Sequence, residues 1–297
     1  TAQGGEGIET EELLVFPGFE ELLALFKMME IDEAGEYDVL IVDCAPTGET
    51  LSLLKFPEMF EGFMSKIFAM ERKVVKTAGP FIEKTIKIPM PEDNVFDDIE
   101  KLCDQMAKLK ALMMDKERVS IRIVTTPEKI VVKESQRNFS YLHLYDYNVD
   151  AVIVNKVYPV KALSGYFNQW IENQEESLSV IQKSFGEIPI FQMPFLKNEL
   201  RTLERLKTAA EIIYGKTNPI NVLAKNKIFT VDQVNGTYFL RIVLPFIDKK
   251  DLNLLQKGEE LSLTIKNQQR NFILPGKLKN KTVSGATYEN GQLNISF

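Results

Sequence analysis

The fold is decided by the stretch YDVLIVD (residues 37–43), which is followed directly by CAPTG (residues 44–48). Its four consecutive apolar residues are typical of a strand that is buried on both faces, as in a parallel sheet. Open α/β sheets bind their ligands at the carboxyl ends of the strands, where Asp43 would lie. The Pro, Thr and Gly behind it suit a turn that exposes N–H groups and a hydroxyl to an anion. The stretch therefore predicts a ligand site at Asp43.

Three further segments of the first 200 residues have the pattern of buried strands, and amphipathic helical stretches separate them. The predicted strands are 37–43, 119–125, 149–155 and 188–193. The predicted helices are 18–30, 50–78, 92–115, 127–145, 161–184 and 197–213. Strands that alternate with helices indicate βαβ crossovers, so we expect an α/β fold with a doubly wound, mostly parallel sheet. Each strand runs into a turn-like sequence, and these turns would gather at one carboxyl edge.

The pattern changes after Gly215, and the last part of the chain predicts a small all-β sandwich. From Phe229 the apolar and polar residues alternate, with turn signals at Asn235-Gly236, Lys257-Gly258 and Asn290-Gly291. Residues 227–297 carry a net charge of +4 against −6 for the whole chain, which leaves −10 for the first 226 residues. We therefore expect two domains, 1–226 and 227–297.

Composition excludes several classes of protein. The chain has 297 residues, of which 44% are hydrophobic and 26% charged, as in a globular protein with one large and one small domain. Its apolar runs are shorter than a membrane span and no signal peptide opens it, so we expect a soluble, cytoplasmic protein. Two cysteines and one histidine, His143, offer neither a disulfide framework nor zinc spacing, and we expect His143 to be structural. The acidic major domain argues against nucleic-acid binding.

Five motifs together resemble the arsenical-pump ATPase family, whose eukaryotic and archaeal relatives target tail-anchored membrane proteins. The stretch DCAPTGETL (residues 43–51) is similar to the family's switch II motif D-T-A-P-T-G-H-T-L. Weaker similarities occur at FPGFEEL (16–22), TPE (126–128), VNK (154–156) and MPFL (193–196). The resemblance extends through much of the first 215 residues.

The resemblance implies a homodimeric, ATP-hydrolysing enzyme with ATP and Mg²⁺ as cofactors. Asp43 would be the Walker B-type acid that holds Mg²⁺ through water, because this cation prefers oxygen ligands and keeps several waters. Thr47 and Gly48 would sense the γ-phosphate. Asn155, beside Lys156, would recognise adenine, since one amide offers both a donor and an acceptor. Residues 194–195 (Pro194 and Phe195) would lie against the base.

The sequence also departs from the family's pattern. ATPases of this type cradle the phosphates with a glycine-rich loop that carries a lysine, and TAQGGEG (residues 1–7) lacks the Lys-Ser/Thr ending. We therefore expect the chain to be the C-terminal portion of a longer protein, inactive alone without its Walker A loop. Glu49 stands where the switch motif commonly has histidine, and Cys44 where it has threonine.

The predicted β-domain resembles the α-crystallin domain of small heat-shock proteins. The similar stretches are LPF (244–246), DKKDL (248–252), LP (274–275) and ATYENGQLNI (286–295), of which the last is the most specific. Some bacterial members of the ATPase family carry such a domain at their C-terminus, so the two resemblances support each other.

A methionine-rich stretch lies in the predicted helical insertion, residues 58–115. Seven of the ten methionines fall between Met59 and Met114. Flexible Met side chains suit a surface that accepts varied apolar sequences, so this insertion could hold a hydrophobic client helix or a membrane protein partner. A helical core explains the same pattern. Arsenite would need clustered thiols, and Cys103 stands alone in this segment.

Two other functions remain open. One is a nucleotide-independent binding or chaperone-like protein that uses the helical insertion and the crystallin-like surface. The other is a MinD-like partitioning ATPase, for which we would expect a C-terminal amphipathic membrane helix instead of a β-sandwich. A glycine-rich G-K-G-G-x-G-K-[ST] stretch upstream of Thr1 would favour the ATPase over the first alternative.

Overall fold

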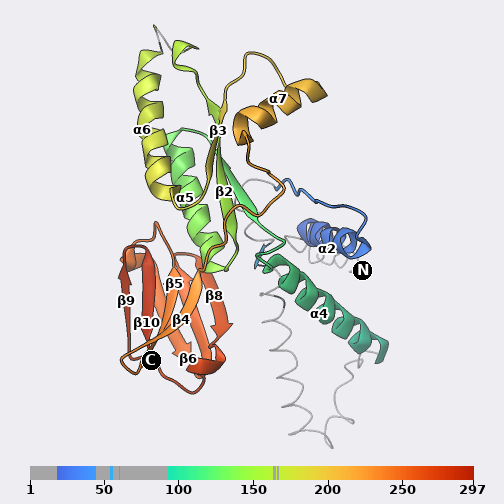
Figure 1. Cartoon of the computed structure of the whole chain (residues 1–297). Coiled ribbons are helices and arrows are strands. Elements are labelled where there is room, and N and C mark those ends of the chain that lie inside the picture. Colours follow the sequence, from blue (N-terminus) through green and yellow to red (C-terminus); the bar gives the residue numbers. More distant parts are fainter. Residues whose placement is uncertain (1–18, 45–53, 56–59, 61–92, 163–164, 166) are drawn as a thin grey trace, which may run out of the picture. The chain divides into compact units, whose positions relative to one another are not determined.

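A computed structural model gives the structure of the chain and describes residues 19–44, 54–55, 60, 93–162, 165 and 167–297 (Figure 1). The chain divides into two compact units, Thr1–Met113 and Met114–Phe297. The sheet that carries most of the predicted site residues lies in the second unit, together with the β-sandwich.

The described part of the first unit is a pair of packed helices, α2 (Phe19–Ala34) and α4 (Asp93–Met113). Leu25 and Met29 of α2 and Leu109 of α4 are buried, and Lys108 lies 3.8 Å from Glu33. Both helices form where the sequence predicts them. In α4 the side chains of Met106 and Met113 are buried as well. For these two methionines the structure supports the helical core and not a client-binding surface. Residues 61–92 of the predicted insertion lie outside the described residues.

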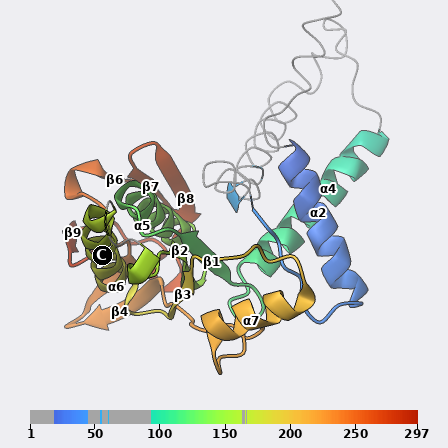
Figure 2. The same cartoon turned by 90° about the horizontal axis from the view of Figure 1, so that it is seen from above.

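The second unit begins with a three-stranded parallel sheet, and its strands are β1 (Ile121–Thr125), β2 (Val149–Val157) and β3 (Ile190–Pro194). Helices connect and follow them: α5 (Lys129–Leu144), α6 (Asn168–Phe185) and α7 (Leu203–Tyr214), with the short helix η2 (Val160–Ala162) before α6. Helices α5 and α6 cover one face of the sheet and α7 the other (Figures 1 and 2). The predicted doubly wound α/β architecture is thereby confirmed.

The core of this sheet forms because β2 lies between two partners. Val149, Ala151, Val152 and Val154 of β2 have no exposed surface, which is the near-continuous apolar run expected of a central parallel strand. Helix α6 contributes Ile181 and Phe185 to this core at helical spacing.

The predicted strand at residues 37–43 is wrong. This segment has no strand assignment and pairs with no strand among the described residues. Its side chains are exposed, with Tyr37 at 69% and Ile41 at 86%. An apolar run indicates a preference for burial, but a strand forms only where its N–H and C=O groups meet a neighbouring strand. The run alone could not supply that neighbour.

The C-terminal part is the predicted all-β sandwich. One antiparallel sheet has the order β4-β5-β10-β9 and the other β6-β7-β8. The elements are β4 (Phe229–Val234), β5 (Thr237–Val243), η3 (Lys249–Asp251), β6 (Leu252–Lys257), β7 (Glu260–Ile265), β8 (Gln268–Ile273), η4 (Gly276–Leu278), β9 (Gly285–Glu289) and β10 (Gln292–Ser296). Alternate residues of β7 are fully buried, as expected of a strand with one face in a core.

Two of the predicted turns explain the hairpin register. Asn235 and Gly236 have φ of 51° and 85°, and Asn290 and Gly291 have φ of 52° and 74°. Two successive residues with positive φ match the twist of antiparallel strands, and Asn-Gly accepts this conformation at little cost. The β4-β5 and β9-β10 hairpins therefore form where the sequence indicates them.

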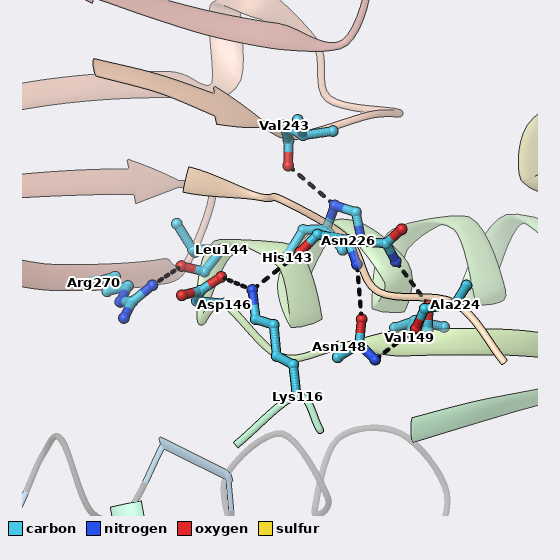
Figure 3. Close-up of polar contacts among 10 residues, drawn as sticks. All are labelled: Lys116, His143, Leu144, Asp146, Asn148, Val149, Ala224, Asn226, Val243 and Arg270. Atoms are coloured by element: carbon cyan, nitrogen blue, oxygen red, sulfur yellow. Dashed lines mark hydrogen bonds and ion pairs between the residues drawn. The ribbon is translucent and has the colours of Figure 1, made fainter. Parts of the chain in front are cut away.

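The sandwich is docked on the amino edge of the parallel sheet, at the end of α5 (Figure 3). His143 donates from Nδ1 to the carbonyl oxygen of Val243 at 3.1 Å, and Arg270 donates from Nη1 to that of Leu144 at 2.8 Å. The ring of Phe246 adds an apolar contact, 5.7 Å from that of Phe185. The sandwich therefore lies at the edge opposite to the carboxyl ends of the strands.

The connection between the sheet and the sandwich is fixed by side chains that precede the strands β1 and β2 (Figure 3). Asn148, just before β2, donates to the carbonyl oxygen of Ala224 at 2.9 Å and accepts from the N–H of Asn226 at 3.0 Å. Lys116 donates to Asp146 at 2.6 Å and to the carbonyl oxygen of Asn226 at 3.2 Å. Because these groups hold the connection on both sides, the sandwich and the sheet form a continuous unit.

Burial of His143 at this contact predicts a pH dependence of stability. Because a carbonyl oxygen only accepts, the neutral ring carries its proton on Nδ1, and Nε2 is buried without a partner. Burial lowers the pKa of His143 to about 4, against an ordinary value of 6.5, and the charge of Lys116 lowers it too. Below pH 6.5 His143 gains a proton in the unfolded chain but not in the folded chain. The contribution of the neutral, buried His143 to the free energy of unfolding is therefore complete above pH 6.5 and falls as the pH decreases towards 4.

We expect this difference to cost the protein about 2 kcal/mol of unfolding free energy between pH 7 and pH 5. The measurement is urea unfolding at both pH values, with His143→Gln as the comparison. Carboxylate titration is common to both proteins, so the variant should lose about 2 kcal/mol less than the parent. Equal losses in the two proteins would contradict the assignment.

Candidate functional site

Four of the predicted site residues lie together at the carboxyl edge of the parallel sheet. Asn155 and Lys156 are near the end of β2, Pro194 is the last residue of β3, and Phe195 follows it. The backbone N–H of Phe195 donates to the carbonyl oxygen of Val157 at 2.8 Å. The two strand ends are thus bonded to each other beyond the regular ladder.

The end of β2 carries a bulge at the two residues that the sequence selects. Val154 pairs with Gln192 and Val157 with Pro194, so Asn155 and Lys156 face a single residue of β3. Lys156 has φ of 57°, a left-handed conformation that is uncommon outside glycine, and its N–H donates to Oδ1 of Asn155 at 2.9 Å. Bulges change the direction of side chains and occur next to binding sites. The strained backbone at this position therefore supports a functional role for Asn155.

An aromatic pair stands beside the bulge. The rings of Tyr158 and Phe195 are stacked, with centroids 5.1 Å apart and planes inclined by 25°. Tyr158 is 37% exposed and Phe195 is 48% exposed. Two rings that stay half-exposed at the ends of β2 and β3 offer a flat apolar surface to a planar ligand.

A buried glutamine of α6 fixes this arrangement. Gln174 is 6% exposed, accepts from the N–H of Tyr158 at 2.8 Å and donates to its carbonyl oxygen at 3.0 Å. The sequence pattern indicates neither residue, although Tyr158 lies in the turn-like sequence after the strand predicted at 149–155. The signal for Gln174 was its spacing, because Ser177 and Ile181 continue the same buried face of the helix.

The end of β1 adds hydroxyl groups to the same edge. Thr125 is 1% exposed, and its Oγ1 accepts from the hydroxyl of Ser135 at 2.9 Å. Thr126 donates to Glu128 at 3.3 Å within the predicted TPE motif. The ends of β1, β2 and β3 therefore lie at one carboxyl edge of the sheet, as the sequence predicts.

The other predicted site residues belong to the first unit. Asp43 is an exposed residue of the segment that forms no strand, while Thr47 and Gly48 lie outside the described residues. Only Asn155, Lys156, Pro194 and Phe195 are brought together by one sheet.

The residues present fit the two cofactors unequally. An amide beside stacked rings fits a nucleotide base, since it offers a donor, an acceptor and an apolar face. For Mg²⁺ the carboxylate of Asp43 is a suitable donor. Over the described part of the chain, no three His, Cys, Asp or Glu residues cluster as a metal site. Among the helices with described residues, none is both long enough and apolar enough to cross a bilayer.

Comparison with known proteins gives two family matches. Residues 1–215 match the family model described as anion-transporting ATPase, and residues 235–297 match the HSP20-like domain found in ArsA. A putative arsenical pump-driving ATPase 1 from Aquifex aeolicus is 33% identical over 292 residues, which cover 97% of this chain and 74% of that protein. A putative arsenical pump-driving ATPase from Chlorobaculum tepidum is 29% identical over 299 residues, which cover 100% of this chain and 74% of that protein. The ATPase GET3C of Arabidopsis thaliana is 28% identical over 67% of this chain and 52% of its own length.

Proposed function

We propose that this chain, which belongs to the anion-transporting ATPase family, binds the base of ATP at the carboxyl edge of the β1-β2-β3 sheet and contributes Asp43 to hydrolysis. The observation that carries this proposal is the family match over residues 1–215, because that range holds both Asp43 and the bulged end of β2. The bulge and the aromatic pair support it independently, since both lie at the carboxyl ends of parallel strands, where ligands bind.

Each site residue has a proposed role in this reaction. Asn155 reads the edge of adenine with its amide, beside Lys156, while Pro194 and Phe195 lie against the base. Asp43 would hold Mg²⁺ through a water, and the ion would supply charge neutralisation on the phosphates. Thr47 and Gly48 gain or lose contacts with the γ-phosphate when it is cleaved.

We further propose that the protein works as a homodimer and passes its nucleotide state to a client or a membrane partner. The helical insertion at about residues 58–115 would hold an apolar helix of that partner, which its methionine content supports. The names of the relatives, pump-driving and GET3-type ATPases, support a partner of this kind. The domain boundary is proposed near residue 226, and the two family matches lie on either side of it.

The test is equilibrium binding of Mg–ATP to the full-length protein, with Asn155→Leu as the variant. We expect the Kd for ATP to rise about tenfold, because a leucine leaves the polar edge of the base without partners. Binding of tripolyphosphate should stay unchanged, since it has no base. The control is Asn253→Leu, an exposed asparagine of the sandwich, which should bind ATP like the parent.

Two results would count against the proposal. A parent protein that binds no ATP would remove the nucleotide site and favour the nucleotide-independent alternative. Equal losses of ATP and tripolyphosphate affinity in Asn155→Leu would show that Asn155 does not read the base.

A further inference from the structure

We propose that Gln174 and Tyr158 are positioning residues for the base: Gln174 holds Tyr158, and Tyr158 holds the ring of Phe195 so that its exposed face stacks on the base. This inference rests on the proposed nucleotide function and assigns the two residues that sequence analysis missed. Neither residue reacts with the nucleotide, and both act through Phe195.

Gln174 fixes the backbone of Tyr158 through two hydrogen bonds. One buried amide accepts from the N–H of Tyr158 and donates to its carbonyl oxygen, at 2.8 and 3.0 Å. Rotation of the Tyr158 backbone would break one of these bonds and leave a buried polar group without a partner. Pro159 restricts the backbone of the residue before it as well. The position of the Tyr158 ring is therefore set by the sheet and α6.

The ring of Tyr158 stacks on the ring of Phe195. Tyr158 covers one face of Phe195 at a centroid distance of 5.1 Å, and the N–H of Phe195 donates to the carbonyl oxygen of Val157, the residue before Tyr158. Phe195 still keeps 48% of its surface exposed. A planar base on the exposed side would complete a stack of three rings beside Asn155.

Its exposure distinguishes the pair of Tyr158 and Phe195 from an ordinary core contact. Phe139 and Phe185 also form a ring pair, with centroids 5.3 Å apart, but these rings are 7% and 1% exposed. Rings that serve packing are buried in this way, because burial is what makes them stabilising. Tyr158 and Phe195 instead leave a large apolar surface in water at the end of two parallel strands, where ligands bind.

The experiment compares ATP with tripolyphosphate, which shares the phosphates but lacks the base, on the full-length protein. Stacking of one base on an aromatic side chain contributes enough affinity that its loss weakens binding about tenfold. We expect Tyr158→Ala to raise the Kd for ATP about tenfold and to leave that for tripolyphosphate within about twofold. Tyr158→Phe keeps the ring and should bind ATP like the parent.

Gln174 is tested in the same assay. We expect Gln174→Leu to raise the Kd for ATP about fivefold, again with little change for tripolyphosphate. The matched control is Gln182→Leu, because Gln182 is an exposed glutamine of the same helix. It should bind both ligands like the parent.

The outcomes distinguish this inference from the proposed function. If the parent binds ATP and Tyr158→Ala binds it equally well, the inference is overturned while the nucleotide site stands. Parallel losses of ATP and tripolyphosphate affinity in Tyr158→Ala would also overturn it, since they would indicate a general structural role. A parent that binds no ATP overturns both. Tyr158→Ala decides the question even if Gln174→Leu fails to fold, because Tyr158 lies at the surface.

Discussion

Asp43→Asn is expected to lower kcat for ATP hydrolysis by the full-length protein about a hundredfold or more, with only a small change in the Kd for ATP. The amide keeps the size of the side chain and one acceptor oxygen but removes the negative charge. In the proposed site that charge would hold Mg²⁺ through a water, and the ion would neutralise the charge that develops on the transferred phosphoryl group. The proposed contacts of Asn155 and Phe195 with the base are unchanged in this variant.

The measurement is steady-state phosphate release at saturating ATP, together with equilibrium ATP binding. Asp38→Asn is the matched control, because Asp38 lies in the same exposed segment, five residues earlier in the chain. It should hydrolyse ATP at the rate of the parent. Equal rates in Asp43→Asn and Asp38→Asn would contradict the role of Asp43.

The pattern of the second unit could be predicted because its elements follow from local rules. Helix α6 buries one face at helical spacing, and the central strand has a continuous apolar run. Boundaries were less accurate. Helix α7 begins at Leu203 and not at 197, because Thr202 caps it by accepting from the N–H of Arg205 at 3.4 Å. Strand β2 continues past the bulge to Val157, two residues beyond its predicted end.

The parts that could not be predicted depend on partners distant in the sequence. An apolar run at residues 37–43 does not show whether a neighbouring strand is available to it. Helix α6 carries several amide side chains, and the sequence does not show which of them is buried. Only the fold brings Gln174 into contact with Tyr158, which lies 16 residues earlier in the chain. The resemblance to the α-crystallin domain predicted a sandwich, but not that His143 and Arg270 fix it to the end of α5.

An ion pair between β1 and β2, with a buried carboxylate, holds the chain between α7 and the sandwich and carries the second large prediction. Asp150 of β2 has no exposed surface and lies at an irregularity in the pairing with β1. Arg122 donates to both of its carboxylate oxygens, at 3.2 and 3.3 Å, and the N–H of Leu223 donates to one of them at 3.0 Å. Arg122 also donates to the carbonyl oxygen of Asn221 at 3.1 Å. The pair therefore fixes the chain that leads into the sandwich.

Arg122→Leu is expected to lower the free energy of unfolding by about 3 kcal/mol, because it leaves the carboxylate of Asp150 buried without its cation. Adding Asp150→Asn to this variant removes the buried charge and keeps an acceptor for Leu223, so the double variant should recover a large part of the loss. Urea unfolding at pH 7 measures the free energy of unfolding of the parent, the single variant and the double variant.

The control is Lys225→Ala, which breaks the exposed pair of Lys225 with Glu117 and should cost less than about 1 kcal/mol. If Arg122→Leu costs no more than Lys225→Ala, the carboxylate of Asp150 does not depend on Arg122. If the double variant recovers nothing, the loss comes from packing around the arginine and not from an uncompensated charge.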